Sequence, residues 1–165
     1  QPVWLATGTR AATAGLMLTR AGTIALRALV ELARCQGGVL SGPELAKRQE
    51  LPEARLEQIL LQLRQAQLIE ARRGRSGGYR LSRAAEDLSV QEVLDAVGGR
   101  RQLSLDLEPA EGSIGQAGQR LEQQLQQRLQ RAVERELSQL SVAELLYDQR
   151  SWEASLDPDQ GLMLG

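Results

Sequence analysis

The apolar positions in the front half of the chain follow helical spacing, interrupted at short intervals by residues that start or stop helices. Thr19 can cap a helix that runs to about Gln36. Its interior is apolar on more than one face, which predicts burial from two sides (Ile24, Leu26, Leu29, Val30, Leu32). Ser41 and Glu44 have the spacing of a capping box, so we expect a short helix to begin there and to stop near Glu50.

A second amphipathic helix is expected over residues 52–67. Pro52 suits its first turn, where the missing N–H is no loss. One face carries apolar residues at i, i+3, i+4 and i+7, the stripe expected to face the core (Leu56, Ile59, Leu60, Leu63). The opposite face carries polar and small side chains beside one leucine (Ala54, Gln58, Leu61, flanked by Glu57 and Gln62). Two helices joined by a short turn predict a helix-turn-helix.

Two short strands, at residues 69–72 and 79–82, are expected to form a hairpin after this helix. Three glycines lie between them and permit positive φ (Gly74, Gly77, Gly78). Five arginines crowd the hairpin and one acid, Glu70, opposes them (Arg72, Arg73, Arg75, Arg80, Arg83). A helix with exposed polar side chains beside a basic two-stranded wing is typical of proteins that bind duplex DNA.

The rear half of the chain predicts a different kind of element. Ser89 and Glu92 form a second capping box, opening a short helix that ends at Gly98. Residues 100–118 are predicted to be a loop, and a long helix is expected over residues 119–147. Its apolar residues form one stripe on a glutamine-rich background (Leu121, Leu125, Leu129, Val133, Leu137, Leu140). So narrow a stripe favours packing against a partner chain, with packing on its own domain as the alternative.

The predicted fold is therefore mainly α with a small β-wing: a winged helix-turn-helix domain followed by a long dimerisation helix. The domain occupies residues 17–99, with the loop, the long helix and a loose tail at residues 148–165 behind it. Residues 1–16 are expected to be a disordered leader. A chain of 165 residues suits one small domain with such an extension.

Charge separates the two halves of the chain, although the net charge is −1. Residues 18–83 carry twelve Lys and Arg against six Asp and Glu, whereas residues 84–165 carry seven against fifteen. A basic front half suits a nucleic-acid reader attached to another element. The chain has no Phe, two Trp and two Tyr, too few stacking aromatics to favour single-strand binding.

Cys35 is the single cysteine, which excludes an intrachain disulfide and fits a reducing cytoplasm. We interpret it as a small buried side chain near a helix end, with a redox-sensing thiol as the alternative. The chain has no His and no nucleophile–base pair, and its Gly-rich segment lies between strands, so an enzyme is not expected. The sequence contains no run of eighteen apolar residues, so a membrane span is not predicted.

The order of elements and two motifs resemble one bacterial family. Leu56-Glu57-Gln58-Ile59-Leu60 in the second amphipathic helix is followed about twenty residues later by Gly77-Gly78-Tyr79-Arg80-Leu81 in the wing. Together they resemble the Rrf2 family of winged helix-turn-helix transcriptional regulators. The resemblance covers about residues 18–99, and the long helix agrees only in kind.

The resemblance implies a homodimer that binds a pseudo-palindromic operator in double-stranded DNA and blocks or alters transcription. Helix 52–67 would enter the major groove and the wing the minor groove, with Glu57 and Gln58 facing bases and Arg73 in the wing. The chemistry agrees, because Gln can pair with adenine and Glu can accept from cytosine. Arginine suits the negative potential of a narrow minor groove.

Many relatives carry three cysteines in the loop before the long helix and hold an iron–sulfur cluster there. Here residues 100–112 contain no Cys. One thiol cannot hold a cluster within one chain, so no cofactor is predicted. We interpret the acids of this loop as a charged loop rather than a metal site (Asp106, Glu108, Glu111). The signal that controls the regulator is not identified by the sequence, and a small-molecule effector and a protein effector both stay open.

The predicted DNA-binding residues belong to two groups. Arg73 and Arg75 are expected to anchor the wing, and Arg72 and Arg80 to add affinity for the DNA backbone. Base choice is assigned to the helix (Glu57 and Gln58, with Arg55 as a further candidate). Tyr79 is expected to be a packing anchor for the wing. Two alternatives stay open: a winged-helix protein–protein interaction module whose wing docks an acidic partner, and a redox-sensing regulator acting through Cys35.

Overall fold

The computed structural model describes residues 18–102 and 111–156 of the chain. The predicted leader, the middle of the predicted loop and the end of the predicted tail lie outside these residues. The elements follow in this order: α1 (Arg20–Arg34), α2 (Gly42–Gln49), α3 (Glu53–Gln65), β1 (Ile69–Arg72), β2 (Gly78–Leu81), the 3₁₀ turn η1 (Ala85–Asp87), α4 (Val90–Ala96), α5 (Gly112–Gln139) and α6 (Val142–Leu156).

The central helix is α1, and the capping predicted for it is confirmed. The Gly22 backbone N–H donates to the Thr19 hydroxyl at 3.2 Å. The helix stops two residues before the predicted end, because Gln36 and the glycine after it have left-handed φ angles of 44° and 85°. The predicted burial on more than one face agrees with the packing of α1 against five other elements (α2, α3, α4, β2 and α6).

The helix-turn-helix forms as predicted. The Glu44 carboxylate accepts from the Ser41 backbone N–H at 2.9 Å, and Ser41 Oγ accepts from the Glu44 N–H at 3.3 Å. Glu50 ends α2 in a left-handed conformation, and Pro52 precedes the first residue of α3. The predicted core stripe of α3 is buried (Leu56, Ile59, Leu60, Leu63). Apolar residues from every helix except α5 join it in one core.

The wing is an antiparallel pair of strands with β1 Ile69 opposite β2 Leu81 and Glu70 opposite Arg80. Its second strand begins one residue earlier than predicted, at Gly78. There the wing pairs with the segment before α2, because Tyr79 and Leu40 exchange two backbone hydrogen bonds of 2.7 and 3.0 Å. A Cβ at Gly78 would lie 2.5 Å from the Leu40 carbonyl oxygen, so this close pairing requires a glycine.

The single long helix predicted over residues 119–147 is wrong. The structure has two helices, α5 and α6, that meet at an extended Leu140 with φ −76° and ψ 122°. Ser141 and Glu144 form a third capping box, in which Glu144 accepts from the Ser141 N–H at 2.8 Å and Ser141 Oγ accepts from the Glu144 N–H at 3.2 Å. Backbone bonds tie the junction to Leu88 and Val90 at the start of α4, with N–O distances of 2.9 and 2.8 Å.

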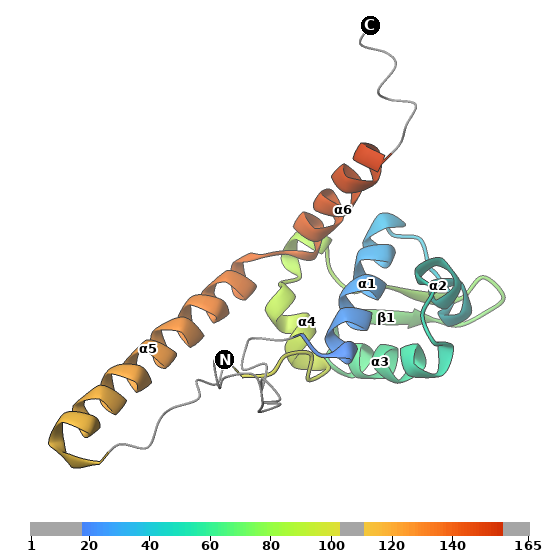
Figure 1. Cartoon of the computed structure of the whole chain (residues 1–165). Helices are drawn as coiled ribbons and strands as arrows, with labels where there is room; N and C mark the ends of the chain where they lie inside the picture. The colour runs from blue at the N-terminus through green and yellow to red at the C-terminus, as the bar shows by residue number, and fades with distance from the viewer. Residues whose placement is uncertain (1–17, 103–110, 157–165) are drawn as a thin grey trace, which may run out of the picture.

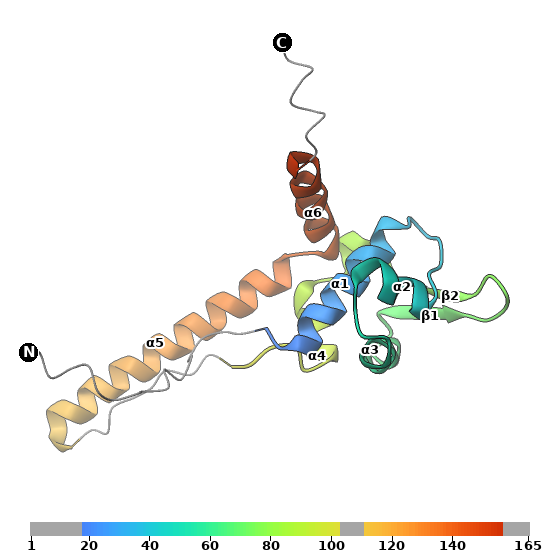
Figure 2. The same cartoon turned by 45° about the vertical axis from the view of Figure 1, so that its right-hand side comes forward.

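Both predicted ends of that segment are also corrected. Residues 112–118, expected to be loop, form the first turns of α5, and residues 148–156, expected to be a loose tail, belong to α6. Helix α6 packs on α1, with Val142 and Leu146 buried. Helix α5 instead projects from the body of the molecule, and the two views show it extending away from the helix-turn-helix and the wing (Figures 1 and 2). Among the described residues, no helix combines the length and apolarity that crossing a membrane requires.

Candidate nucleic-acid interface

The outward face of α3 carries the predicted base-reading side chains. Arg55, Glu57 and Gln58 are all exposed, as are Ala54 and Leu61. This face lies opposite the buried stripe that packs α3 on the core. The helix begins without a side-chain cap, directly after Pro52, so its first backbone N–H groups have no partner from a capping side chain. The exposed face is therefore polar, with one leucine among its side chains.

Glu57 differs from Gln58 in the direction its side chain takes. A Cβ at Gly42, in the first turn of α2, would lie 2.0 Å from Glu57 Oε1, so the carboxylate rests against that turn. A carboxylate is favoured beside a helix N-terminus. Glu57 also acts on the wing: burial raises the pKa of Tyr79, and the charge and hydrogen bond of Glu57 raise it further. Glu57 thus links α2, α3 and the wing.

The tip of the wing carries unpaired positive charge. Arg72, Arg73 and Arg75 are exposed, and none of them makes an ion pair or a side-chain hydrogen bond with another described residue. The turn between them is closed by a 3.0 Å hydrogen bond from the Gly77 N–H to the Gly74 carbonyl. Gly74 has a φ of 115°, a conformation that favours glycine. This turn leaves three guanidinium groups free to meet an anion.

The other two wing arginines are paired. Arg80 binds the Glu70 carboxylate opposite it, with N–O distances of 2.9 and 3.1 Å. Arg83 binds Glu92 at 2.9 Å, and the pKa of Glu92 is lowered by its bonds to the Ser89 backbone and to Arg83. Arg80 is therefore less available to DNA than the prediction assumed. Tyr79 is half-buried against the core, as expected for a residue that anchors the wing.

Helix α3 and the wing lie next to each other, because α3 leads into β1 through a short turn and packs against it. Figure 2 shows α3 beside the two strands, with α5 on the far side of the molecule. The exposed side chains of α3 and the free arginines of the wing thus occupy the same end of the protein.

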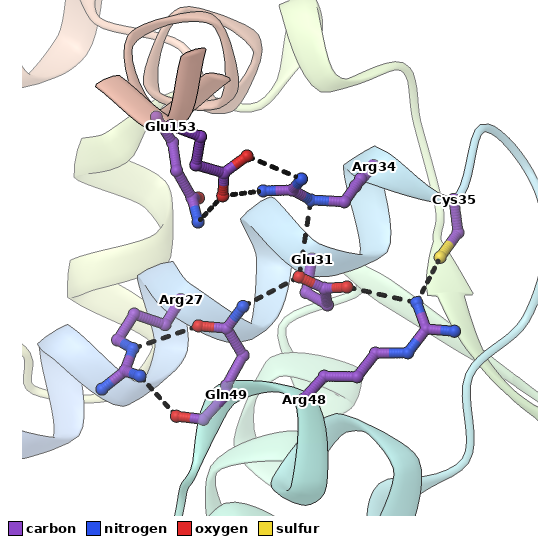
Figure 3. A network of polar contacts seen from close by, with 8 residues as sticks. Arg27, Glu31, Arg34, Cys35, Arg48, Gln49 and Glu153 are labelled. Atoms are coloured by element: carbon purple, nitrogen blue, oxygen red, sulfur yellow. Dashed lines mark hydrogen bonds and ion pairs between the residues drawn. The ribbon is translucent and has the colours of Figure 1, made fainter. Parts of the chain in front are cut away.

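A polar network, missed in the sequence, holds α2 and α6 against α1 (Figure 3). Its centre is the buried carboxylate of Glu31, 5% exposed, which accepts from Arg48 at 3.2 Å and from Gln49 at 2.8 Å. Arg34 lies 3.6 Å from Glu31 and makes two bonds of 2.7 and 3.0 Å to Glu153 of α6. The pairing with Arg34 lowers the pKa of Glu153. The sequence did contain a signal for this network, because Glu31 is the one acid in an otherwise apolar stretch of α1.

Cys35 lies at the C-terminal end of α1 and is half-buried, somewhat more exposed than predicted. Its sulfur accepts a hydrogen bond from Arg48 Nη1 at 3.6 Å, and the same guanidinium binds Glu31 (Figure 3). The redox interpretation of Cys35 stays a prediction.

Comparison with known proteins gives the family. A family model described as "Rrf2: Iron-dependent Transcriptional regulator" matches residues 18–148. The chain belongs to the Rrf2 family. This is a family of transcriptional regulators rather than enzymes. The chain is 33% identical over 149 residues to a putative HTH-type transcriptional regulator of Synechocystis sp., a match that covers 85% of this chain and 94% of the relative.

Other Rrf2 relatives match over shorter spans. The chain is 42% identical over 85 residues to the HTH-type transcriptional regulator IscR of Cereibacter sphaeroides, covering 50% of this chain and 55% of IscR. It spans about half the length of this and the next curated relatives that it matches.

Solved structures are similar to this chain over more than the winged helix-turn-helix domain. A putative transcriptional regulator from Listeria innocua gives a TM-score of 0.69 at 28% identity, over 81% of this chain and 88% of that structure. CymR of B. subtilis gives 0.66 at 24% identity, over 79% and 96%, which shows the shared fold.

Although the family description names iron, the side chains of this Rrf2 protein do not fit an iron–sulfur cluster. Cys35 is the one cysteine, it bonds to Arg48, and the chain has no His. In residues 18–102 and 111–156, no group of three or more His, Cys, Asp or Glu is placed to hold a metal ion. Asp106 and Glu108 of the acidic loop lie outside those residues. Iron–sulfur clusters are held mainly by cysteine thiolates, and one thiol per chain does not supply such a ligand set.

The predicted dimerisation stripe follows α5 and is exposed along its outer half. Leu121, Leu125 and Leu129 are 68%, 51% and 39% exposed, and Val133 and Leu137 are half-buried nearer the body. Leu140 no longer belongs to the helix, because it forms the junction with α6. No residue of this 28-residue helix is buried. A helix with so long an uncovered apolar stripe lacks the packing that would stabilise it in water.

A hollow of about 510 Å³ lies between the C-terminal end of α1, the base of the wing and α6. Leu32, Leu81 and Leu146 line its apolar part, and Arg83 and Arg150 line its polar part. Its size falls in the range of small-molecule sites. An effector, whether small molecule or protein, stays a prediction.

Proposed function

We propose that this Rrf2 protein is a homodimeric, sequence-specific DNA-binding transcriptional regulator that acts on a pseudo-palindromic operator without an iron–sulfur cluster. The observation that carries the proposal is the pairing of an exposed polar face on α3 with three unpaired arginines on the adjacent wing tip (Arg72, Arg73, Arg75). Helix α3 presents hydrogen-bonding groups to base edges in the major groove, and the wing meets phosphates or the neighbouring minor groove.

Gln58 is the base reader that the geometry supports best. Its amide is exposed and carries both a donor and an acceptor, which suits bidentate pairing with adenine. Glu57 is turned toward Gly42 and Tyr79, so it positions the helix and the wing relative to each other. Arg55, one turn before Gln58, is a second candidate for contact with a base or phosphate.

The dimer supplies the twofold symmetry of the operator. The uncovered stripe of α5 supports a second copy of the chain as its partner, since two such stripes bury each other. Two copies place two α3 helices on one duplex, and two half-sites then account for specificity that one short helix cannot supply alone.

A salt titration tests DNA binding and separates it from a protein-docking module. The full chain is titrated onto a fluorescent random duplex at several salt concentrations, and anisotropy reports binding. A DNA-binding wing predicts affinity that falls steeply with salt as phosphate counterions are released. No binding at low salt would contradict the proposal and favour an acidic protein partner.

The base-reading assignment has its own test. Gln58→Ala is expected to relax the preference at one position of each half-site, at a cost of about 1–3 kcal/mol on the preferred sequence. Glu53→Ala, at the exposed start of the same helix, is the matched control and should keep the preference. Competition among operator variants that differ at single base pairs measures both. An unchanged preference profile in Gln58→Ala would contradict the assignment.

A further inference from the structure

Leu61 is an exposed leucine on the side of α3 that faces away from the core. Its side chain is 54% exposed, whereas the four residues of the buried stripe on the same helix are at most 2% exposed. Leu61 follows Gln58 by three residues and Ala54 by seven, so the three share one face. It is the one large apolar side chain that α3 presents to solvent, and it contributes nothing to the core.

Leu61 has polar side chains of α3 beside it and, on one side, apolar residues as well (Ala21, Ile59, Val97). Two shallow hollows meet at Gln58 and Leu61, one continuing past Arg55 and the other past Arg64 and Tyr79. The Gln58 amide makes no side-chain hydrogen bond with another described residue. The face therefore places a free amide and a branched apolar group one helical turn apart.

This pair of side chains matches a particular feature of the major groove. Thymine is the only base that presents a methyl group there, and adenine presents the donor and acceptor that a glutamine amide pairs with. Gln58 and Leu61 are about 4.5 Å apart along the helix axis, which corresponds to one to two base-pair steps of about 3.4 Å. An apolar side chain beside the amide thus favours thymine one or two positions away, because thymine offers a methyl group for it to pack against and cytosine does not.

We propose that Leu61 contacts the C5-methyl group of a thymine in each half-site, one or two base pairs from the one that Gln58 reads. The inference rests on the proposed DNA-binding function and deepens it by assigning a second specificity residue. It also gives a reason for an apolar side chain on an otherwise polar recognition face.

Deoxyuridine tests this contact, because it pairs as thymine does but lacks the methyl group. The probe is an operator selected from random duplexes by the full chain, with thymines replaced in symmetric pairs, one pair at a time. Fluorescence anisotropy gives the Kd of each duplex. For the wild-type chain, one pair of replacements is expected to raise the Kd about fourfold per half-site, or about fifteenfold for both.

The variants assign the effect to Leu61. Leu61→Ala should bind the thymine and deoxyuridine operators with equal Kd. Gln62→Ala, the exposed neighbour, should keep the full thymine-to-deoxyuridine ratio. The inference is overturned if no replaced pair affects wild-type binding, or if Leu61→Ala keeps the ratio. A chain that selects no duplex at all would overturn the proposed function together with this inference.

Discussion

Positive charge on the wing is divided between free and paired side chains. Arg73 has no ion-pair or hydrogen-bond partner for its side chain among the described residues, whereas Arg80 forms an ion pair with Glu70. To bind a phosphate, the guanidinium of Arg80 either leaves the Glu70 carboxylate or brings that negative charge near the phosphate. The two arginines therefore differ in what they offer DNA, although they lie on the same hairpin.

Arg73→Ala is expected to weaken binding to every duplex and to flatten the dependence of log K on log salt by about one unit, because one phosphate contact is lost. Arg80→Ala is the matched variant on the same wing, and it should change the slope less. Anisotropy titrations on random duplex DNA measure both. Equal slopes for Arg73→Ala and the wild type would show that the wing tip does not contact phosphate.

Residue types on the interface could be predicted from the sequence, but their pairing could not. The alternation of apolar and polar positions was enough to place Gln58 outside and Leu60 inside. The bond between Arg80 and Glu70 depends on which residues of the two strands lie opposite each other. The geometry of the hairpin turn sets this register, and the sequence alone did not fix it. The turn of Glu57 toward Gly42 likewise depends on how closely α2 and α3 approach.

The buried carboxylate of Glu31 is expected to matter most among the charged residues of the body. Glu31→Ala removes the acceptor for Arg48 and Gln49 and leaves Arg34 with one partner, so we expect a loss of about 1.5–3 kcal/mol in unfolding free energy. Glu153→Ala, which breaks only the exposed link to α6, should lose less. Urea unfolding measures both, and an equal loss in the two variants would contradict this ranking.

Among the helices, three capping boxes set where α2, α4 and α6 begin. Two of them were predicted, and the third, at Ser141, was missed although it has the same spacing. The apolar stripe continues through Leu137 and Leu140 at helical spacing, with no Gly or Pro to stop it. The break is imposed by backbone bonds to residues about fifty positions away at the start of α4, which local sequence does not reveal.

The capping box of α4 predicts a dependence of stability on pH. Bonds to Ser89 and Arg83 lower the pKa of Glu92 in the folded state. The stabilisation is thus complete above the pKa of an unfolded glutamate, about 4.3, and is lost as pH falls through the lower folded value. Glu92→Gln keeps an acceptor at this position but loses the charge. It should lower the unfolding free energy at neutral pH and reduce its decline in acid; an unchanged acid profile would contradict the assignment.

At the scale of the whole molecule, α5 is the element whose apolar stripe a single chain leaves exposed. Its 28 residues make a helix about 42 Å long, and its stripe is progressively covered only where it approaches α4. Its existence could be predicted from the leucine spacing. Its position relative to the body could not, because the junction at Leu140 sets the direction in which it leaves.

Leu125→Asp places a charge in the middle of the exposed stripe and is expected to shift the chain from dimer to monomer, since a buried unpaired charge is costly. Gln127→Asp adds the same charge at an exposed position about 200° around the helix from Leu125, on the opposite face, and should leave the dimer intact. Sedimentation velocity distinguishes the two states. A dimer that survives Leu125→Asp would show that another surface joins the copies.

The most direct test of gene control by this protein is selection of bound fragments from the genome of its host by the purified full chain, followed by sequencing. A homodimeric operator-binding protein should enrich a short inverted repeat whose half-sites lie about one helical turn apart, as two symmetry-related α3 helices require. Arg73→Ala should reduce recovery of all fragments, and Leu125→Asp should abolish enrichment of the paired half-sites. Recovery of fragments in proportion to their abundance, with no shared sequence, would contradict the account.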